Sequence, residues 1–273
     1  MKLLIMGDVH GHIKLFADIV NKTDCDVVLQ CGDLGIWSLK DFINWGYVED
    51  KHGHYNVYDT MVPITDVTNS KIVFNKPVYF IIGNHENFDL FDLMYKNGEF
   101  DGRYNLNYIP YNKLIQAENY KDTVKVSGLS GCYSYKVYSG GIQNARKKSR
   151  QIKVKPETPP DIEEYLNRVM GRDPRGRFKF KEVEALMDQK ADILLLHEIP
   201  TGVNVSSMLS LKNESGCSVL NQLIEEMQPR FVFCGHWHRW YSSKIGRSEI
   251  VVLPDILHGY GILNTDTWEF EKK

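Results

Sequence analysis

The chain is short of cysteine, of net charge and of long apolar runs. Its five cysteines include no C-x-x-C spacing, which argues against a zinc ribbon or a thioredoxin-like redox site. The formal net charge of −2 predicts no chain-wide attraction to polyanions. No apolar run approaches the roughly 20 residues that span a bilayer, and Lys2-Leu3-Leu4-Ile5 is too short for the apolar part of a signal peptide. We therefore expect a cytoplasmic protein with no membrane segment.

Histidine and acidic residues, in contrast, gather directly after apolar runs. Runs such as Lys2–Met6 and Val78–Ile82 predict buried strands. Five polar blocks follow such runs: Gly7-Asp8-Val9-His10-Gly11, Gly32-Asp33, Gly83-Asn84-His85-Glu86, His197-Glu198 and Gly235-His236-Trp237-His238. Because open α/β sheets place their ligand sites at strand ends, we expect these five blocks to converge on one point.

The chemistry of these side chains indicates a metal centre. Imidazole and carboxylate together suit borderline divalent metals such as Mn, Fe, Zn and Co. The set is too large for one ion, since a tetrahedral zinc needs only four ligands. Two ions roughly 3.5–4 Å apart fit better, and such pairs cleave phosphate esters. Asn84 offers a neutral oxygen to a metal, which leaves the adjacent His85 for acid–base chemistry.

Two of the blocks carry a pair of candidate ligands. Asp8 and His10 are two positions apart, and so are His236 and His238. In an extended segment, residues with this spacing project to the same side. Each pair is therefore expected to present two ligands to one site, with the preceding glycine allowing a sharp turn off the strand.

The order D-x-H, G-D, G-N-H-E, H and G-H-x-H resembles that of the calcineurin-like metallophosphoesterases, over about the whole chain. The resemblance implies an α/β fold, the four-layer αββα metallophosphoesterase sandwich. It implies a first metal on Asp8, His10 and His238, a bridging Asp33, and a second metal on Asn84, His197 and His236. His85 would face the scissile phosphate. Glu86 stands where many members have Asp, a residue that usually supports the neighbouring His.

A narrower similarity points to RNA lariat debranching enzymes within that family. The segments Val28–Asp33, Ile82–Glu86, Val126–Tyr133 and Phe180–Glu184 resemble parts of those enzymes. They usually carry Cys at the first ligand position, where this chain has Asp8, so debranching itself is not implied. What the similarity indicates is a phosphodiester substrate, with a nucleotide or nucleic acid as the candidate.

Apolar periodicity predicts the elements between the blocks. We expect helices over residues 13–22, 88–96, 161–170, 181–190 and 217–227. We expect strands over residues 2–7, 26–31, 77–82, 192–197 and 230–235, short strands within 104–128, and further strands in the tail 240–271. Residues 46–75 show no period and are expected to form a long loop over the site.

A single domain is expected over 1–273, with an irregular charged insert at about 133–179 that shapes the pocket rim. Four basic residues of this insert are candidate contacts for substrate phosphates: Arg146, Lys147, Lys148 and Arg150. A solvated surface loop is the alternative, since runs of like charge are common on surfaces.

These observations predict a dinuclear-metal-dependent phosphoesterase that hydrolyses a phosphodiester by attack of a metal-bridging hydroxide. The alternatives are a phosphomonoesterase or protein serine/threonine phosphatase with the same site, and a binding scaffold that has lost its chemistry. The expected cofactors are two divalent ions, with Mn first and Fe, Zn or Co as the other candidates. The expected partner is the phosphate-ester substrate, and no partner protein is evident.

Overall fold

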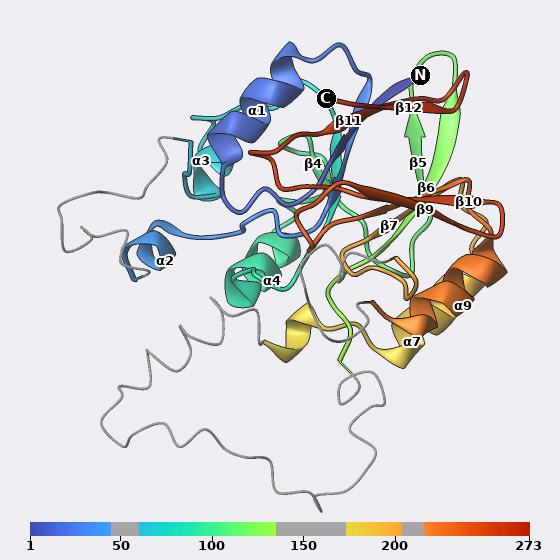
Figure 1. Ribbon diagram of the computed structural model, residues 1–273. Helices are drawn as coiled ribbons and strands as arrows, with labels where there is room; N and C mark the ends of the chain where they lie inside the picture. The colour runs from blue at the N-terminus through green and yellow to red at the C-terminus, as the bar shows by residue number, and fades with distance from the viewer. Residues whose placement is uncertain (45–59, 135–172, 204–215) are drawn as a thin grey trace, which may run out of the picture.

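The computed structural model describes residues 1–44, 60–134, 173–203 and 216–273 (Figure 1). Within these ranges, two six-stranded sheets form the centre of the molecule. The first has the order β12-β11-β1-β2-β3-β4 and the second the order β5-β6-β7-β8-β10-β9. The first comprises β1 (Lys2–Met6), β2 (Val27–Cys31), β3 (Val78–Ile81), β4 (Leu106–Tyr108), β11 (Gly261–Asn264) and β12 (Glu269–Lys272). The second comprises β5 (Ile115–Glu118), β6 (Thr123–Leu129), β7 (Ile193–Leu196), β8 (Phe231–Cys234), β9 (Tyr241–Ile245) and β10 (Ser248–Val252).

The two sheets pack face to face through apolar side chains. Leu29 and Ile81 from the first sheet meet Leu195 and Phe233 from the second in one buried cluster. The sheets approach closely at Gly128 of β6, where an added Cβ would overlap the side chain of Ile81. A larger residue there would push the sheets apart.

Helices cover both outer faces, which completes the four layers αββα expected from the sequence. On the first sheet lie α1 (Ile13–Lys22), α3 (Thr65–Thr68) and α4 (Phe88–Lys96), which share one buried cluster with its strands. On the second lie α7 (Phe180–Met187) and α9 (Ser218–Met227), which share another. Figure 1 shows α1 and α4 on one side of the sheets, and α7 and α9 on the other.

Parallel pairing aligns the strand ends that matter for function. β1, β2 and β3 run parallel in the first sheet, and β6, β7 and β8 run parallel in the second. The carboxyl ends of parallel strands lie at one edge of a sheet. The segments that follow Met6, Cys31, Ile81, Leu129, Leu196 and Cys234 therefore leave at the edges where the polar blocks begin.

Some expectations differ from the structure. The predicted loop over 46–75 includes the short helix α3, while residues 45–59 lie outside the described part. Helix α2 (Leu39–Asn44) was not predicted, and α7 ends three residues before the expected 190. Of the charged insert, only residues 133–134 and 173–179 are described, with a 3₁₀ turn at Pro174–Gly176. The predicted helix over 161–170 lies outside the described residues, and the extent of the single domain stays a prediction.

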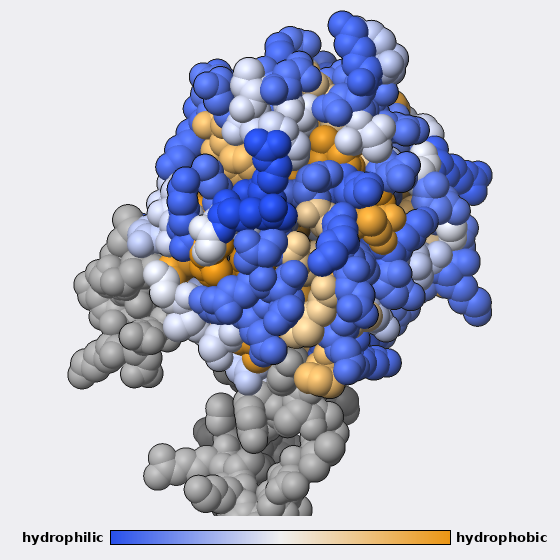
Figure 2. All heavy atoms as spheres, turned by 90° about the vertical axis from the view of Figure 1, so that its right-hand side faces the viewer, coloured by the Kyte–Doolittle hydropathy of each residue, from blue (hydrophilic) through white to orange (hydrophobic). Residues whose placement is uncertain are grey.

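The face of the molecule that Figure 2 shows is mainly polar. On the face drawn in Figure 2, hydrophilic residues dominate and the apolar patches are small and separate. Among the described helices, none combines the length and the apolar character needed to cross a bilayer.

Candidate metal centre

The seven predicted ligand residues lie together at the carboxyl ends of five strands. Asp8 and His10 follow β1, Asp33 follows β2, Asn84 follows β3, His197 follows β7, and His236 and His238 follow β8. Their donor atoms form two neighbouring groups. The strand ends thus converge as the sequence predicts.

The first group consists of Asp8, His10 and His238, whose donor atoms all lie within 4.8 Å of one another. The Nε2 atom of His238 is 2.8 Å from Asp8 Oδ2 and 3.0 Å from His10 Nε2. The His10 Nε2 atom is 3.6 Å from Asp8 Oδ2. Three donors that point at one small volume in this way suit a single cation.

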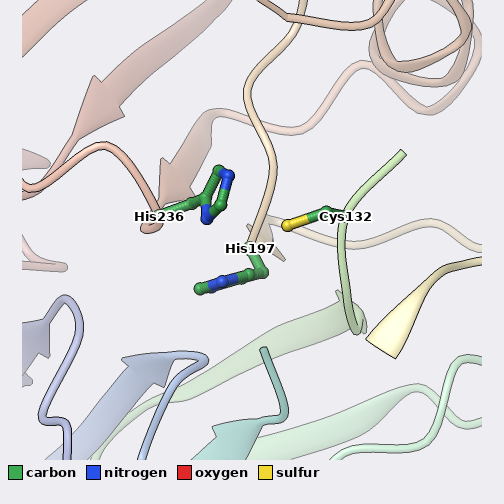
Figure 3. Close-up of side chains that lie close together, drawn as sticks. All are labelled: Cys132, His197 and His236. Atoms are coloured by element: carbon green, nitrogen blue, oxygen red, sulfur yellow. The ribbon is translucent and has the colours of Figure 1, made fainter. Parts of the chain in front are cut away.

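The second group is built around His197, which is fully buried. Its Nε2 atom lies 3.0 Å from Asn84 Oδ1, and its Nδ1 atom lies 2.9 Å from the carbonyl oxygen of Cys31. The contact with this carbonyl fixes the ring, as outer partners do for metal-binding histidines. His236 joins the group from β8, and Cys132 joins it from the segment after β6 (Figure 3).

Asp33 lies between the two groups. Its Oδ2 atom is 3.8 Å from His10 Nε2 in the first group and 3.3 Å from His197 Nε2 in the second. Among the side chains of the described residues, this oxygen is the one buried nitrogen or oxygen atom without a hydrogen-bond partner. A buried carboxylate oxygen without a partner is costly, and cations on both sides would satisfy it. The residues present therefore fit a pair of divalent ions.

The backbone at the ligands departs from the extended form assumed for the paired positions. His10, Asp33, His236 and His238 all have positive φ, between 45° and 68°. Few residues other than glycine adopt this region, and such strain concentrates at functional sites. Asp8 and His10 do meet in one group, but His236 and His238 serve different groups, because left-handed backbone redirects their side chains.

Two glycines make room for the carboxylates. A Cβ at Gly83 would overlap Asp33 Oδ1, and a Cβ at Gly235 would overlap Asp8 Oδ1. Neither glycine has positive φ. Both glycines are therefore required for close approach, and Gly235 does not use the left-handed backbone that the expected sharp turn would favour.

The carboxylates and imidazoles hold one another in charged forms. Burial opposes ionisation of Asp33, but the positive charges of the nearby imidazoles, that of His197 first, hold its pKa well below the usual range. Burial lowers the pKa of His10, but the nearby carboxylates of Asp8 and Asp33 outweigh this and raise the pKa to about 9. Burial lowers the pKa of His236 and raises that of the Cys132 thiol to about 12. The protonated rings of His10 and His197 thus supply positive charge at the two positions where the ligand groups would hold cations.

His85 is positioned by its backbone. Its amide donates to Asp33 Oδ1 at 2.8 Å, and its carbonyl accepts from Trp37 Nε1 at 2.7 Å. Its ring packs edge-on against that of His10, with the centroids 5.6 Å apart. Unlike Asn84, His85 is only partly buried, so it borders the centre on the solvent side. Trp37 is buried behind the site.

Glu86 stabilises the loop that carries Asp33. Its carboxylate accepts hydrogen bonds from the amides of Leu34, Gly35 and Ile36, at 2.7 to 3.1 Å. Burial and the charge of Asp33 raise the pKa of Glu86 to about 7. These contacts give Glu86 a definite role in holding the backbone directly after Asp33, besides the support of His85 that the sequence suggested.

An open pocket of about 540 Å³ adjoins the first group. It is lined by His236, Trp237, His238, Arg239, Asp255 and His258. His238 Nδ1 lies 3.7 Å from Asp255 Oδ2, and Trp237 Nε1 donates to Glu198 at 3.1 Å. The pocket therefore lies beside the candidate metal positions.

Sequence reasoning missed two residues near the centre. Cys132 follows β6 after a glycine, and Asp255 follows β10, so each repeats the strand-end pattern that located the ligands. Cys132 was not picked because a cysteine after an apolar run is most often a core residue, and Asp255 lies outside the five polar blocks. The basic residues Arg146, Lys147, Lys148 and Arg150 lie outside the described residues.

Comparison with known proteins bears on the fold and the family. The chain is similar in structure to the protein TT1561 of Thermus thermophilus, at a TM-score of 0.55 and 14% identity, covering 100% of this chain and 97% of that one. It also resembles a novel archaeal phosphodiesterase, at a TM-score of 0.43 and 13% identity, covering 100% and 99% of the two chains. A third is a phosphopantetheinyl hydrolase from Mycobacterium tuberculosis, at a TM-score of 0.47 and 12% identity, covering 93% and 89%. At these identities the first likeness concerns the fold alone, and nothing further about this chain follows from the other two.

The sequence gives a more specific result. No curated protein matches it, but the model of the calcineurin-like phosphoesterases matches residues 1–240. This match includes every strand that delivers a candidate ligand. The chain therefore belongs to the calcineurin-like phosphoesterase family, whose members use divalent metals to hydrolyse phosphate esters.

Proposed function

We propose that the protein hydrolyses a phosphodiester with two divalent ions held at these two groups. The observation that carries the proposal is the position of Asp33 Oδ2, which is buried without a hydrogen bond between His10 and His197. One carboxylate shared by two imidazole groups is what a bridged pair of ions requires.

The residues divide between the ions by proximity. Asp8, His10 and His238 would hold the first, and Asn84, His197 and His236 the second, with Asp33 contacting both. When bound, the ions would supply an activated water and neutralise charge on the phosphoryl oxygens. Imidazole, carboxylate and amide donors accept Mn²⁺ as well as Fe²⁺, Co²⁺ or Zn²⁺, and Mn²⁺ stays our first candidate.

His85 is proposed as the proton donor to the leaving oxygen. Its backbone is tied to Asp33 and Trp37, and its ring stands beside that of His10 on the accessible side of the centre. A side chain on that side can reach a phosphate seated at the metal positions. General acid catalysis of this kind contributes about 10²–10⁴ to a rate.

The preference for a diester is supported by the charges of the pocket. Among its lining residues, Arg239 is the one arginine or lysine and Asp255 the one carboxylate. A dianionic monoester would gain from additional cationic side chains, whereas a monoanionic diester needs fewer of them. A diester also carries a substituent on each of two phosphate oxygens, and the site must hold both. A pocket of about 540 Å³ beside the first group offers room for the second substituent. We propose a nucleotide or nucleic acid as the substrate, and a cytoplasmic location stays a prediction.

The test is hydrolysis of matched chromogenic substrates, an aryl phosphodiester and its monoester, by metal-stripped protein reloaded with Mn²⁺. We expect a higher kcat/KM on the diester, and no turnover without metal. A preference for the monoester would replace the proposal with a phosphomonoesterase or protein phosphatase. Two bound ions without turnover of either substrate would indicate a binding scaffold.

A further inference from the structure

Cys132 differs from the other cysteines of the chain in its surroundings. All five are free and buried. Cys25, Cys31, Cys217 and Cys234 each belong to one of the three apolar core clusters. Cys132 belongs to none of these clusters, and its thiol contacts polar groups of the candidate metal centre. Packing of the core therefore explains the other four cysteines but not this one.

The sulfur of Cys132 lies among the donors of the second group. Its Sγ is 3.0 Å from Asn84 Oδ1, and the same oxygen is 3.0 Å from His197 Nε2. Sγ and the donor nitrogens of His197 and His236 all lie within 4.8 Å of one another. Donors that share one ion at bond lengths near 2.0–2.3 Å stand about 3–4 Å apart. Figure 3 shows the three side chains converging from three separate segments.

The backbone fixes this position. The amide of Gly131 donates to the carbonyl of Ile82, two residues before Asn84, at 2.9 Å. The amide of Cys132 donates to Gly176 at 2.9 Å, and its carbonyl accepts from Phe178 at 3.3 Å. Gly131 has a φ of 80°, and a Cβ there would overlap Gly176. The chain therefore turns at Gly131, and contacts on both sides hold the thiol against Asn84.

A second observation points to an ion at the same place. Asp33 Oδ2, buried without a hydrogen bond, lies 3.3 Å from His197 Nε2. The Nε2 atom of His197 therefore lies close to two oxygens, Asn84 Oδ1 and the Asp33 oxygen that has no hydrogen-bond partner. The thiol completes a set of sulfur, nitrogen and oxygen donors around one small volume.

We propose that Cys132 is a further ligand of the second ion, together with Asn84, His197 and His236. The inference rests on the proposed function only in requiring an ion at the second group. Cysteine coordinates through its thiolate sulfur, so a metal–sulfur bond forms and the thiol proton is released to solvent. A soft sulfur donor turns this position toward Zn²⁺ or Fe²⁺ and away from Mn²⁺. The two positions of the centre therefore differ in metal preference.

X-ray absorption of the zinc-loaded wild-type protein tests this directly. We expect a sulfur scatterer at about 2.3 Å, near one for every two zinc ions. With Co²⁺ in place of zinc, we expect a thiolate-to-metal absorption band in the near ultraviolet. A spectrum with nitrogen and oxygen scatterers alone overturns the proposal, and this measurement needs no variant.

Variants give an independent readout of metal preference. Cys132→Ser and Cys132→Ala should abolish the cobalt band and weaken Zn²⁺ binding by at least about 10-fold, the lower end of losses at supporting residues. Mn²⁺ binding should change less, because manganese gains little from sulfur. Cys25→Ala is the matched control, since Cys25 is buried just before β2, at the opposite end of that strand from Asp33. Equal losses for Zn²⁺ and Mn²⁺, or an unchanged cobalt band, would refute the role of the sulfur.

The outcomes separate this proposal from the proposed function. Diester turnover with two ions but no sulfur scatterer rejects the ligand role of Cys132 and keeps the hydrolase. A sulfur scatterer without turnover of any phosphate ester keeps the ligand and rejects the hydrolase. Failure of the second group to bind any ion rejects both.

Discussion

The backbone amide of His85 donates a hydrogen bond to one carboxylate oxygen of Asp33 at 2.8 Å, while the other oxygen of Asp33 is buried between the two ligand groups. The proposed proton donor and the proposed bridge are therefore fixed to each other through the first residues after β2 and β3. A shift of either loop would move both groups together. Metal content and turnover are therefore two readouts of the same region.

Replacement of Asp33 by Asn should cost both ions together. The Asn side chain keeps an oxygen that can accept a hydrogen bond from the backbone amide of His85. It lacks the negative charge that Asp33 presents to both ligand groups. We expect each affinity to fall by about 100-fold or more, at or beyond the upper end of losses for outer partners. Metal analysis after dialysis measures this. Asn84→Ala is the matched control and should lose only the second ion. A full second ion in Asp33→Asn would exclude the bridging role.

Truncation of His85 should separate chemistry from metal binding. We expect His85→Ala and His85→Gln to lower kcat by about 10²–10⁴ because a general acid is removed. Both should keep the wild-type metal content, since neither ligand group contains His85. Steady-state kinetics and metal analysis on the same preparation check this. Loss of one ion in step with activity would show that His85 is a ligand.

Enlargement of Gly83 should disturb the centre through contact alone. In Gly83→Ala, the new Cβ would overlap Asp33 Oδ1, and overpacking of this kind costs about 1–3 kcal/mol. We expect reduced melting temperature and weaker binding of both ions, measured by calorimetry and titration.

Gly202→Ala provides the contrast for Gly83→Ala. Its φ of 88° strains an alanine, by roughly 1–3 kcal/mol, but its Cβ would meet no described atom within 4 Å. We expect a similar loss of stability and unchanged metal affinity. If both variants lost metal equally, general destabilisation would explain the effect of Gly83→Ala.

The stability of the metal-stripped protein should fall as pH rises from mildly acidic to alkaline. Burial raises the pKa of Glu86 from 4.5 to about 7, and contacts with Asp8, which outweigh burial, raise that of His10 from 6.5 to about 9. Groups that hold a proton more tightly when folded stabilise the fold below their unfolded pKa, and this is lost as pH passes their folded pKa. His236, whose pKa is lowered, acts oppositely but only below about its unfolded value of 6.5.

Melting temperatures of the metal-stripped protein across pH 5 to 9 measure this effect. The Mn²⁺-loaded protein is the control and should show a weaker fall, because bound ions replace the protons on His10. A metal-stripped protein that became more stable across that range would contradict the proton linkage.

The basic cluster should discriminate substrates by charge. Exchange of Arg146, Lys147, Lys148 and Arg150 for Gln should weaken the binding of single-stranded oligonucleotides by about 10-fold or more at low salt. Each contact with a phosphate contributes to affinity through counterion release. A small aryl diester should be hydrolysed as before. Titrations at two salt concentrations measure the change in slope.

The matched control removes four charges from the edge of the sheets that is remote from the candidate metal centre. Its positions are exposed lysines before the strands or near their beginnings, namely Lys22, Lys121, Lys125 and Lys190. We expect oligonucleotide binding close to wild type. An equal loss in both quadruple variants would assign the effect to net charge and leave the cluster without a specific role.

How far the sequence predicts this structure depends on the length of each pattern. Helix α1 was predicted residue for residue, because Ile13, Phe16, Ala17 and Val20 form an apolar face and all four are buried. Helices α2 and α3, with six and four residues, are too short to show such a face. Strand order and the pairing of the two sheets depend on contacts between distant segments, so no local pattern predicts them, and the family resemblance implied only the four-layer sandwich.

For the candidate site, the sequence located the ligand positions but not their backbone. The blocks predicted that Asp8 and His10 would converge, yet His10 does so with a φ of 45° and not in an extended segment. Contacts between distant segments impose such strain, so the local sequence pattern does not indicate it. Cys132 was missed because a cysteine after an apolar strand is most often a core residue, and only its neighbours Asn84 and His197 distinguish it.

His10 and His238 come within 3.0 Å of each other although 228 positions separate them in the chain. A growing chain that has not yet released the segment after β8 therefore lacks the first ligand group, whatever else has folded. Contacts between such distant segments form late, since loop closure must precede them. Capture of an ion at this place consequently marks a molecule whose synthesis has passed His238. Because ligands that bind only the folded form stabilise it, metal supply would favour chains that include His238 over chains truncated before it.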